Sequence, residues 1–146
     1  MPRPRRLPRA AARVVEHPRL KLTDSARWDL YRGGVDEGLL RALADAADRR
    51  RISVSALRSG HPRTVWATSR TSAHALGYAA DIYAVDGALV LRQRETGSPA
   101  HRLATELVAA GADQVGSPWM LPPGGRRAFS DRVHQDHIHL QATARR

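Results

Sequence analysis

The chain has 146 residues, of which 42% are hydrophobic and 26% charged, close to the composition of an average globular protein. A chain of this length can bury a core without cross-links, so a bound metal would serve function rather than folding. There is no cysteine, which excludes disulfides, thiolate metal sites and cysteine nucleophiles. No apolar run approaches the roughly 20 residues of a membrane span, and the N-terminus lacks the apolar segment of a signal peptide, so we expect any export signal to lie outside this chain.

The net charge of +10 is concentrated at the two ends of the chain. Six arginines and Lys21 against Glu16 give residues 1–21 a charge of +6, and residues 145–146 add +2, which leaves +2 for the rest. We therefore expect a disordered Pro/Arg-rich arm or linker over 1–21, a folded domain over 22–142 and a basic tail over 143–146. Such an arm could also bind a polyanion such as nucleic acid or an anionic cell-wall polymer.

The first predicted helices follow this arm. Thr23 or Asp24 is placed to cap a short helix over residues 25–31, which the double glycine at 33–34 would end. Asp36 is placed to cap a longer amphipathic helix. Its apolar positions recur at intervals of three and four, as an amphipathic helix requires: Leu39, Leu40, Leu43, Ala46 and Ala47.

Alternating apolar residues predict a strand over 52–58, followed by a loop over 59–72. Two further strands, over 79–85 and 88–92, flank Asp86-Gly87, which is a strong signal for an antiparallel hairpin.

A last helix and two strands complete the predicted elements. Ser98 as cap, Pro99 at the first helical position and Gly111 past the end define the helix. Short strands follow near residues 114–115 and 137–141. This order predicts an α+β fold with a small central antiparallel sheet and helices packed on one of its faces.

Three of the seven histidines lie within six residues near the C-terminus: His134, His137 and His139. On a strand, His137 and His139 point to the same face, about 6.6 Å apart along the chain. One of them can hold a metal while its neighbour faces the molecule that the metal binds.

A second polar pair interrupts the apolar stretch S-A-H-A-L-G-Y-A-A-D. His74 lies on the loop that leads into a predicted strand, Asp81 lies early in that strand, and Gly77 allows a sharp turn between them. Two imidazoles and one carboxylate form a three-ligand zinc site with an open position, the arrangement of catalytic zinc. A two-His, one-carboxylate iron site is the nearest alternative, but its first pair is typically spaced H-x-D, so the H-x6-D spacing favours zinc.

The motif S-x-H-x-x-G-x-A-x-D at 72–81, followed by D-H-I-H at 136–139, resembles the zinc D-alanyl-D-alanine carboxypeptidase family. It is also similar to the wider clan that includes the lysostaphin-type and penicillin-insensitive murein endopeptidases. The segment L-R-S-G-H at 57–61 resembles the strand-end S-G-Y-R of that family, and the likeness covers roughly residues 52–141. The resemblance implies a Hedgehog/DD-peptidase-like fold, hydrolysis of peptidoglycan peptides and a location outside the cell or in the cell wall.

The resemblance also implies roles for individual residues. His74, Asp81 and His139 would bind Zn²⁺, and His137 would be the catalytic histidine that binds no metal. His134 is a second catalytic candidate, by likeness to the murein endopeptidases. Ser72 and Arg70 are candidates for substrate binding. A structural hydrogen bond is the favoured role of Ser72. Arg63 and Arg58 are candidates equal to Arg70.

Two departures separate the chain from the family pattern. None of the four glutamates has the E-x-x-W-H setting of a glutamate base, which leaves attack assisted by histidine. His61 and Pro62 stand where S-G-Y-R has Tyr and Arg, so the usual arginine clamp on the substrate has no counterpart at this position.

Two other functions compete with a peptidase. A zinc-containing module that binds cell-wall peptide without cleaving it would retain the same motifs. A nucleic-acid binder would use the arginine arm, but the near-neutral body and the scarcity of aromatic residues do not favour it. The sequence leaves the scissile bond and the oligomeric state open.

Overall fold

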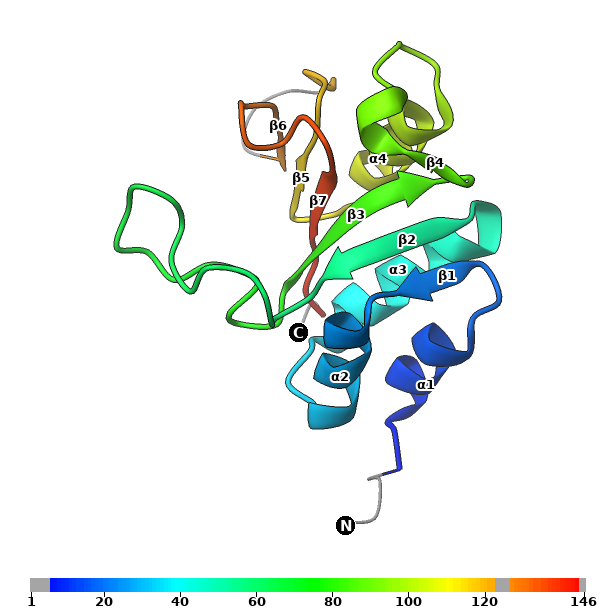
Figure 1. The fold of residues 1–146 in the computed structure, drawn as a ribbon, viewed down its shortest axis with the longest axis vertical. Coiled ribbons are helices and arrows are strands. Elements are labelled where there is room, and N and C mark those ends of the chain that lie inside the picture. Colours follow the sequence, from blue (N-terminus) through cyan, green and yellow to red (C-terminus); the bar gives the residue numbers. More distant parts are fainter. Residues whose placement is uncertain (1–5, 123–126, 145–146) are drawn as a thin grey trace.

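The computed structural model describes residues 6–122 and 127–144, which form an α+β fold with four α-helices and a seven-stranded mixed sheet (Figure 1). The helices are α1 (Arg9–Glu16), α2 (Asp24–Arg32), α3 (Glu37–Arg49) and α4 (Pro99–Ala109). The strands are β1 (Leu20–Leu22), β2 (Ile52–Ala56), β3 (Ala79–Val85), β4 (Ala88–Leu89), β5 (Gln114–Gly116), β6 (Ala128–Phe129) and β7 (Ile138–Gln141). A 3₁₀ turn, η1 (Val90–Arg92), follows β4.

The strand order is β1-β2-β3-β7-β5-β6, with β4 paired to the remaining edge of β3. The expectation of a purely antiparallel sheet is wrong at both ends, because β1 pairs with β2 in parallel and β5 pairs with β6 in parallel. Two parallel strands need a crossover connection that carries the chain back to the end of the sheet where the first strand began. Helices α2 and α3 form this connection between β1 and β2. The centre is antiparallel, with β3 beside β2 and β7.

The core lies between the sheet and its helices. The predicted apolar face of α3 is buried, and in Figure 1 this helix lies behind β2. The strands contribute alternate residues to the same core: Ile52, Val54, Ile82, Ile138 and Leu140. The residues between them, including Asp81 and His139, therefore point to the opposite face of the sheet. No helix in the described part of the chain is long and apolar enough to cross a membrane.

Three predicted helix caps are present. The side chain of Thr23 accepts a hydrogen bond from the Ala26 amide at the start of α2, and Ser98 accepts one from the His101 amide in α4. Asp36 accepts one from the Gly38 amide at the start of α3, and the same carboxylate oxygen accepts another from the Ala144 amide. The end of the described chain is therefore tied to the first turn of α3.

Most of the predicted arm differs from the expectation, since residues 9–16 form α1 and residues 20–22 form β1. Ala11 and Val14 on α1 are buried against the core, and Arg13 forms ion pairs with Asp45 and Asp48 of α3 at 3.0 and 2.7 Å. The stretch between the flanking prolines at 8 and 18 contains no proline and is long enough for two helical turns. Residues 1–5 and 145–146 lie outside the described part.

The hairpin around Asp86-Gly87 is confirmed, with both residues at positive φ (51° and 82°), as a two-residue turn requires. Its second strand is shorter than predicted and covers Ala88–Leu89 alone. The Gln93 side chain donates to the Val85 and Ala88 carbonyls, each at 2.8 Å, which draws the chain out of the sheet toward α4.

Gly77 marks a close approach between the turn before β3 and the segment after α2. Its φ is +81°, and a Cβ there would lie 1.9 Å from the Gly34 carbonyl oxygen. The Gly77 carbonyl accepts a hydrogen bond from the Asp36 amide at 2.8 Å. Only a glycine satisfies both the backbone conformation and this contact.

We expect Gly77→Ala to lower the free energy of unfolding by roughly 3 kcal/mol or more, since it adds a backbone clash to an unfavourable φ. Gly97→Ala is the matched control, because Gly97 has a φ of +86° and a Cβ added there would meet no atom within 4 Å. That control should cost about 1–2 kcal/mol. Urea denaturation measures both, and equal losses would contradict the role given to the contact.

The pair Arg50–Glu106 joins α3 to α4 through two hydrogen bonds of 2.6 and 3.2 Å. The hydrogen bond from Arg50 lowers the pKa of Glu106. A depressed folded-state pKa gives stability that is present above the pKa of the unfolded chain and lost as pH falls through the folded one.

Glu106→Gln should therefore lower the free energy of unfolding by about 1 kcal/mol near neutral pH. This loss should become progressively smaller below the ordinary glutamate pKa of about 4.3. The exposed pair Glu37–Arg41 supplies the control, because its two side chains are 59% and 61% exposed. Urea unfolding across this pH range should show a smaller change for Glu37→Gln. A deficit for Glu106→Gln that does not vary with pH would contradict the ionic interpretation.

Candidate metal centre

Asp81 and His139 are direct cross-strand partners in the antiparallel pair β3–β7. Their neighbours Ile82 and Ile138 are fully buried on the helix side. The pleat therefore places the carboxylate and the imidazole side by side on the opposite face. The alternation predicted from the sequence is confirmed for Asp81 and Ile82 and for Ile138 and His139, whereas His137, predicted to lie on the same strand, precedes β7.

His74 reaches the same point from the turn that precedes β3, and its side chain is fully buried. The Nδ1–H donates over 2.6 Å to the carbonyl of Leu57, the residue that follows β2, and the His74 amide donates to the Ser72 hydroxyl at 3.2 Å. These contacts fix the ring orientation and leave Nε2 as the lone-pair nitrogen of the neutral imidazole.

Three donor atoms converge at this point. His74 Nε2 lies 3.1 Å from Asp81 Oδ1 and 3.2 Å from His139 Nδ1, and the last two atoms are 3.3 Å apart. Four ligands at zinc-like bond lengths of about 2.0–2.2 Å in a tetrahedron stand roughly 3.3–3.6 Å from one another. The spacing of the three atoms is within a few tenths of an ångström of that value.

The protonation of this triangle favours a cation. The His74 Nδ1–H donates to the Leu57 carbonyl, so Nε2 carries a lone pair. This lone pair faces an oxygen of the Asp81 carboxylate, and two hydrogen-bond acceptors that face each other repel. A metal ion bound between these two atoms would remove the repulsion. Imidazole nitrogen and carboxylate oxygen together suit a transition metal such as zinc.

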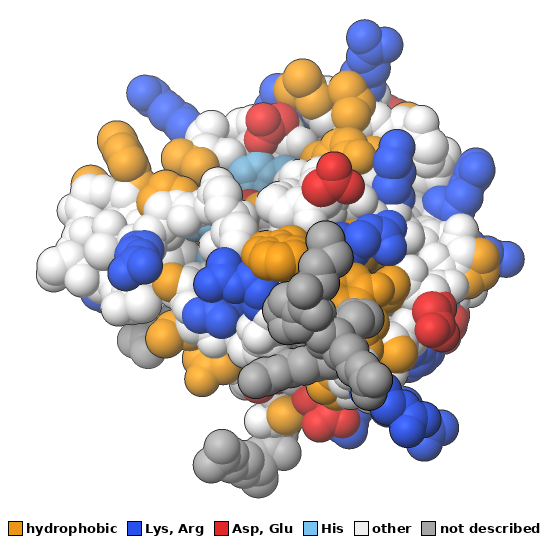
Figure 2. All heavy atoms as spheres, turned by 60° about the horizontal axis from the view of Figure 1, so that its bottom comes forward, with side chains coloured by type: hydrophobic (Ala, Val, Ile, Leu, Met, Phe, Trp, Pro, Cys, Tyr) orange, Lys and Arg blue, Asp and Glu red, His pale blue; other side chains and the backbone are white. Residues whose placement is uncertain are grey.

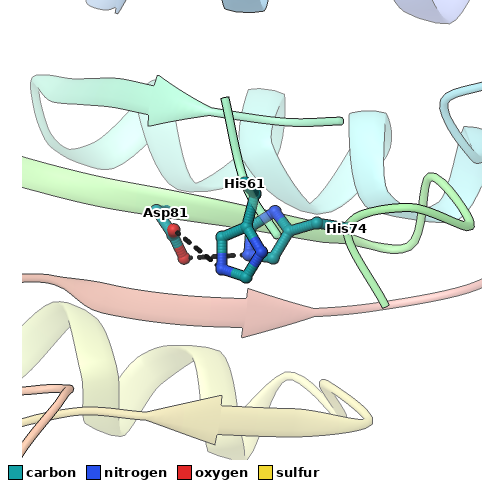
Figure 3. Close-up of side chains that lie close together, drawn as sticks. All are labelled: His61, His74 and Asp81. Atoms are coloured by element: carbon teal, nitrogen blue, oxygen red, sulfur yellow. Dashed lines mark hydrogen bonds and ion pairs between the residues drawn. The ribbon is translucent and has the colours of Figure 1, made fainter. Parts of the chain in front are cut away.

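His61 joins this group, although the sequence identified it only as a departure from a motif. Its ring stacks on His74 with centroids 3.8 Å apart, and its Nε2 lies 3.9 Å from Asp81 Oδ2 (Figure 3). One ligand atom from each of His61, His74 and Asp81 lies within 4.8 Å of the others. Two donor triads thus share His74 and Asp81, and His139 makes the shorter contacts.

His137 and His134 lie at the rim of the centre. His137 Nε2 is 3.7 Å from Asp81 Oδ1, while its Nδ1–H donates to Asp136 at 2.7 Å. His134 donates to Asp131 at 2.6 Å, and its ring centroid is 5.0 Å from that of His137. The structure therefore brings both predicted catalytic candidates to the predicted ligands.

The charge states in the centre are those that metal ligands need. Burial disfavours the Asp81 carboxylate, but its contacts with the neighbouring imidazoles of His139 and His74 outweigh this and hold the pKa of Asp81 far below its ordinary value. Burial lowers the pKa of His139 and of His61. The carboxylate is therefore ionised and these imidazoles are neutral around pH 7.

Asp29 of α2, which sequence reasoning missed, supports the centre from behind. This buried carboxylate accepts hydrogen bonds from the Arg58 and Ser59 amides at 2.9 and 2.7 Å and from the Ser59 hydroxyl at 2.5 Å. It thereby fixes the turn between Leu57, which holds His74, and His61. The sequence W-D-L predicts only a helix, because the partners of Asp29 lie about 30 residues further along the chain.

A pocket of about 690 Å³ opens beside His61. Three basic side chains line it together with hydroxyl groups: Arg32, Arg58 and Arg63, with Ser59, Thr64 and Thr71. Of the two predicted substrate-binding residues, Ser72 is buried and accepts from the His74 amide, so it has a structural contact. Arg70 is exposed and lies outside the lining of this pocket.

No family model, curated protein or solved structure matches the chain. The likeness to zinc D-alanyl-D-alanine carboxypeptidases therefore stays a prediction that rests on the two motifs, and the geometry of the centre stands independently of it.

The two donor triads can be separated by substitution. We expect His139→Ala to retain less of an added transition metal, such as zinc, than His61→Ala does, because His139 makes the shorter contacts with the shared pair. Elemental analysis after dialysis measures this directly, with His101→Ala on α4 as a histidine outside the centre. The reverse result would assign the ion to the triad that contains His61.

Proposed function

We propose that this chain is a zinc-dependent peptidase that hydrolyses peptide bonds of bacterial peptidoglycan. The observation that carries the proposal is the triangle of His74 Nε2, Asp81 Oδ1 and His139 Nδ1, whose sides measure 3.1–3.3 Å. These residues would hold the metal, leaving one tetrahedral position for water or substrate.

Zinc in this site would supply Lewis acidity, which polarises a carbonyl and activates a water at neutral pH. Proton transfer then falls to the protein. His137 suits this role, because Asp136 holds its Nδ1–H and thereby turns the lone pair of Nε2 toward the centre. Nε2 can accept a proton from the attacking water and pass it to the leaving amine.

The residues described around the centre include no glutamate, so histidine is the base that the geometry offers. His134 lies next to His137 and is held by Asp131. We assign it a positioning role, in which it limits the rotation of the His137 ring.

The neighbouring pocket favours an anionic substrate. Its cationic side chains come from Arg32, Arg58 and Arg63, and the Asp29 carboxylate at its wall is already engaged by two amides and a hydroxyl. The Arg58 guanidinium donates to the Gly33 and Ala75 carbonyls, which are neutral, so its positive charge is retained at the wall. Cell-wall peptides carry free carboxylates, which suit such a pocket.

A binding module without catalytic activity is the second candidate, and His61 is the observation in its favour. If His61 Nε2 filled the fourth position, the site would have four protein ligands, as structural zinc sites do. The ring would then exclude the water that hydrolysis needs. Zinc content together with absence of cleavage would favour this module.

We expect His137→Ala to keep its zinc and to lose about 10²–10⁴-fold of the rate of muropeptide hydrolysis, the range for removal of a general acid–base group. Chromatography and mass spectrometry of digested muropeptides measure the rate and identify the bond cleaved. Asp81→Ala should lose both zinc and hydrolysis.

His101→Ala is the control, because His101 lies on α4 and contacts Trp119 rather than the centre. It should cleave at the parent rate. Parent-like hydrolysis by His137→Ala would disprove the assigned role of His137, and zinc-loaded parent protein that cleaves no muropeptide would disprove the peptidase.

A further inference from the structure

A projecting loop lies beside the pocket, outside the candidate metal centre. Residues 62–71, here called the finger, extend away from the body of the molecule (Figure 1), and all of them are exposed. Thr64 and Thr71 pair across its base as an isolated antiparallel bridge.

The tip of the finger is a turn closed by its own hydrogen bonds. The Val65 amide donates to the Arg70 carbonyl, and the Thr68 amide donates to the Val65 carbonyl, each at 2.9 Å. Ala67 adopts a positive φ of 59° within this turn. This turn presents the Trp66 side chain to solvent, 84% exposed.

An indole displayed at the end of a projecting turn is accessible to a partner along both faces of its ring. Tryptophan offers a large flat apolar surface with one polar N–H, and exposed aromatics of this kind are frequent at contact sites.

The finger is also basic. No acidic residue occurs between Asp48 and Asp81, while Arg63 and Arg70 lie on the finger itself. Figure 2 shows basic and hydrophobic side chains on the side of the molecule where the finger projects, and the acidic ones lie elsewhere on this face. The partner is therefore expected to be anionic and to offer a flat face.

The base of the finger is continuous with the pocket. Arg63, Thr64 and Thr71 belong to both, and His61 at the wall of the pocket stacks on His74. A polymer that lies along the finger would therefore place its side branches toward the metal centre.

We propose that the finger binds the glycan strand of peptidoglycan, with a sugar ring stacked on Trp66 and carboxylates of the strand paired with Arg63 and Arg70. The proposal rests on the proposed function, since the peptide branch of the same polymer would occupy the pocket. A single-stranded nucleic acid would call for a row of aromatics, and the finger has one. Binding to a membrane surface would require a broad apolar face. The only large exposed apolar side chains of the finger are Val65 and Trp66.

Sedimentation of the full chain with peptide-free glycan strands and with intact insoluble peptidoglycan tests this. Trp66→Ala should bind both at least tenfold more weakly than the parent, while its hydrolysis of a soluble muropeptide stays unchanged. Trp28→Ala is the matched control, because Trp28 on α2 is 60% exposed and lies outside the pocket lining. It should bind as the parent does.

The outcomes separate the two proposals. If Trp66→Ala loses glycan binding and the parent protein cleaves no muropeptide, the result supports glycan binding by the finger and contradicts the proposed peptidase activity. If Trp66→Ala binds glycan as strongly as the parent does, the proposal that the finger binds glycan is wrong. An equal or larger loss toward a single-stranded oligonucleotide or anionic phospholipid vesicles overturns it as well, because the partner would then be a different polyanion.

Discussion

The candidate centre depends on the register between β3 and β7. Asp81 and His139 meet because the two strands pair at these positions, 58 residues apart in the chain. A slip of β7 by one residue would turn its side chains to the opposite faces, placing His139 in the core and Ile138 on the other face. The apolar residues that hold the sheet against the helices therefore also hold the ligands together. Folding energy and ligand geometry come from the same pairing.

His74 is held by a second set of contacts that is independent of this register. Its ring nitrogen is bonded to the Leu57 carbonyl, and Asp29 fixes the two peptide units that follow Leu57. The close approach of Gly77 to Gly34 fixes the other end of the turn. A buried carboxylate on α2 thus acts on the centre through the Arg58 and Ser59 amides and the Ser59 hydroxyl, without contacting any candidate ligand. Such support leaves the donor atoms free while restricting their orientation.

Sequence patterns predicted the features that depend on local chemistry. The caps at Thr23, Asp36 and Ser98 and the alternation that places Asp81 and His139 on one face all follow from neighbouring residues. The parallel pairing of β1 with β2 was not predicted, because it depends on how two helices return the chain to the sheet. Helix α1 was missed because its surroundings are rich in arginine and proline, and because its two buried side chains, Ala11 and Val14, are small. The approach of His61 to the centre depends on the path of a turn whose anchor is about 30 residues earlier.

The position of β7 has a consequence for how the protein is made. This strand is the last in the described part of the chain, yet it lies between β3 and β5, near the middle of the sheet, and the segment after it is tied to α3 through Asp36. During synthesis, His74 and Asp81 emerge long before their partner, and the sheet keeps an open slot until residues 138–141 arrive. His139 thus joins His74 and Asp81 only when β7 fills its place in the sheet. A nascent or C-terminally truncated chain would lack His139 and retain only the other set, His61, His74 and Asp81. Metal capture by the triad that contains His139 would therefore report that the whole domain has folded.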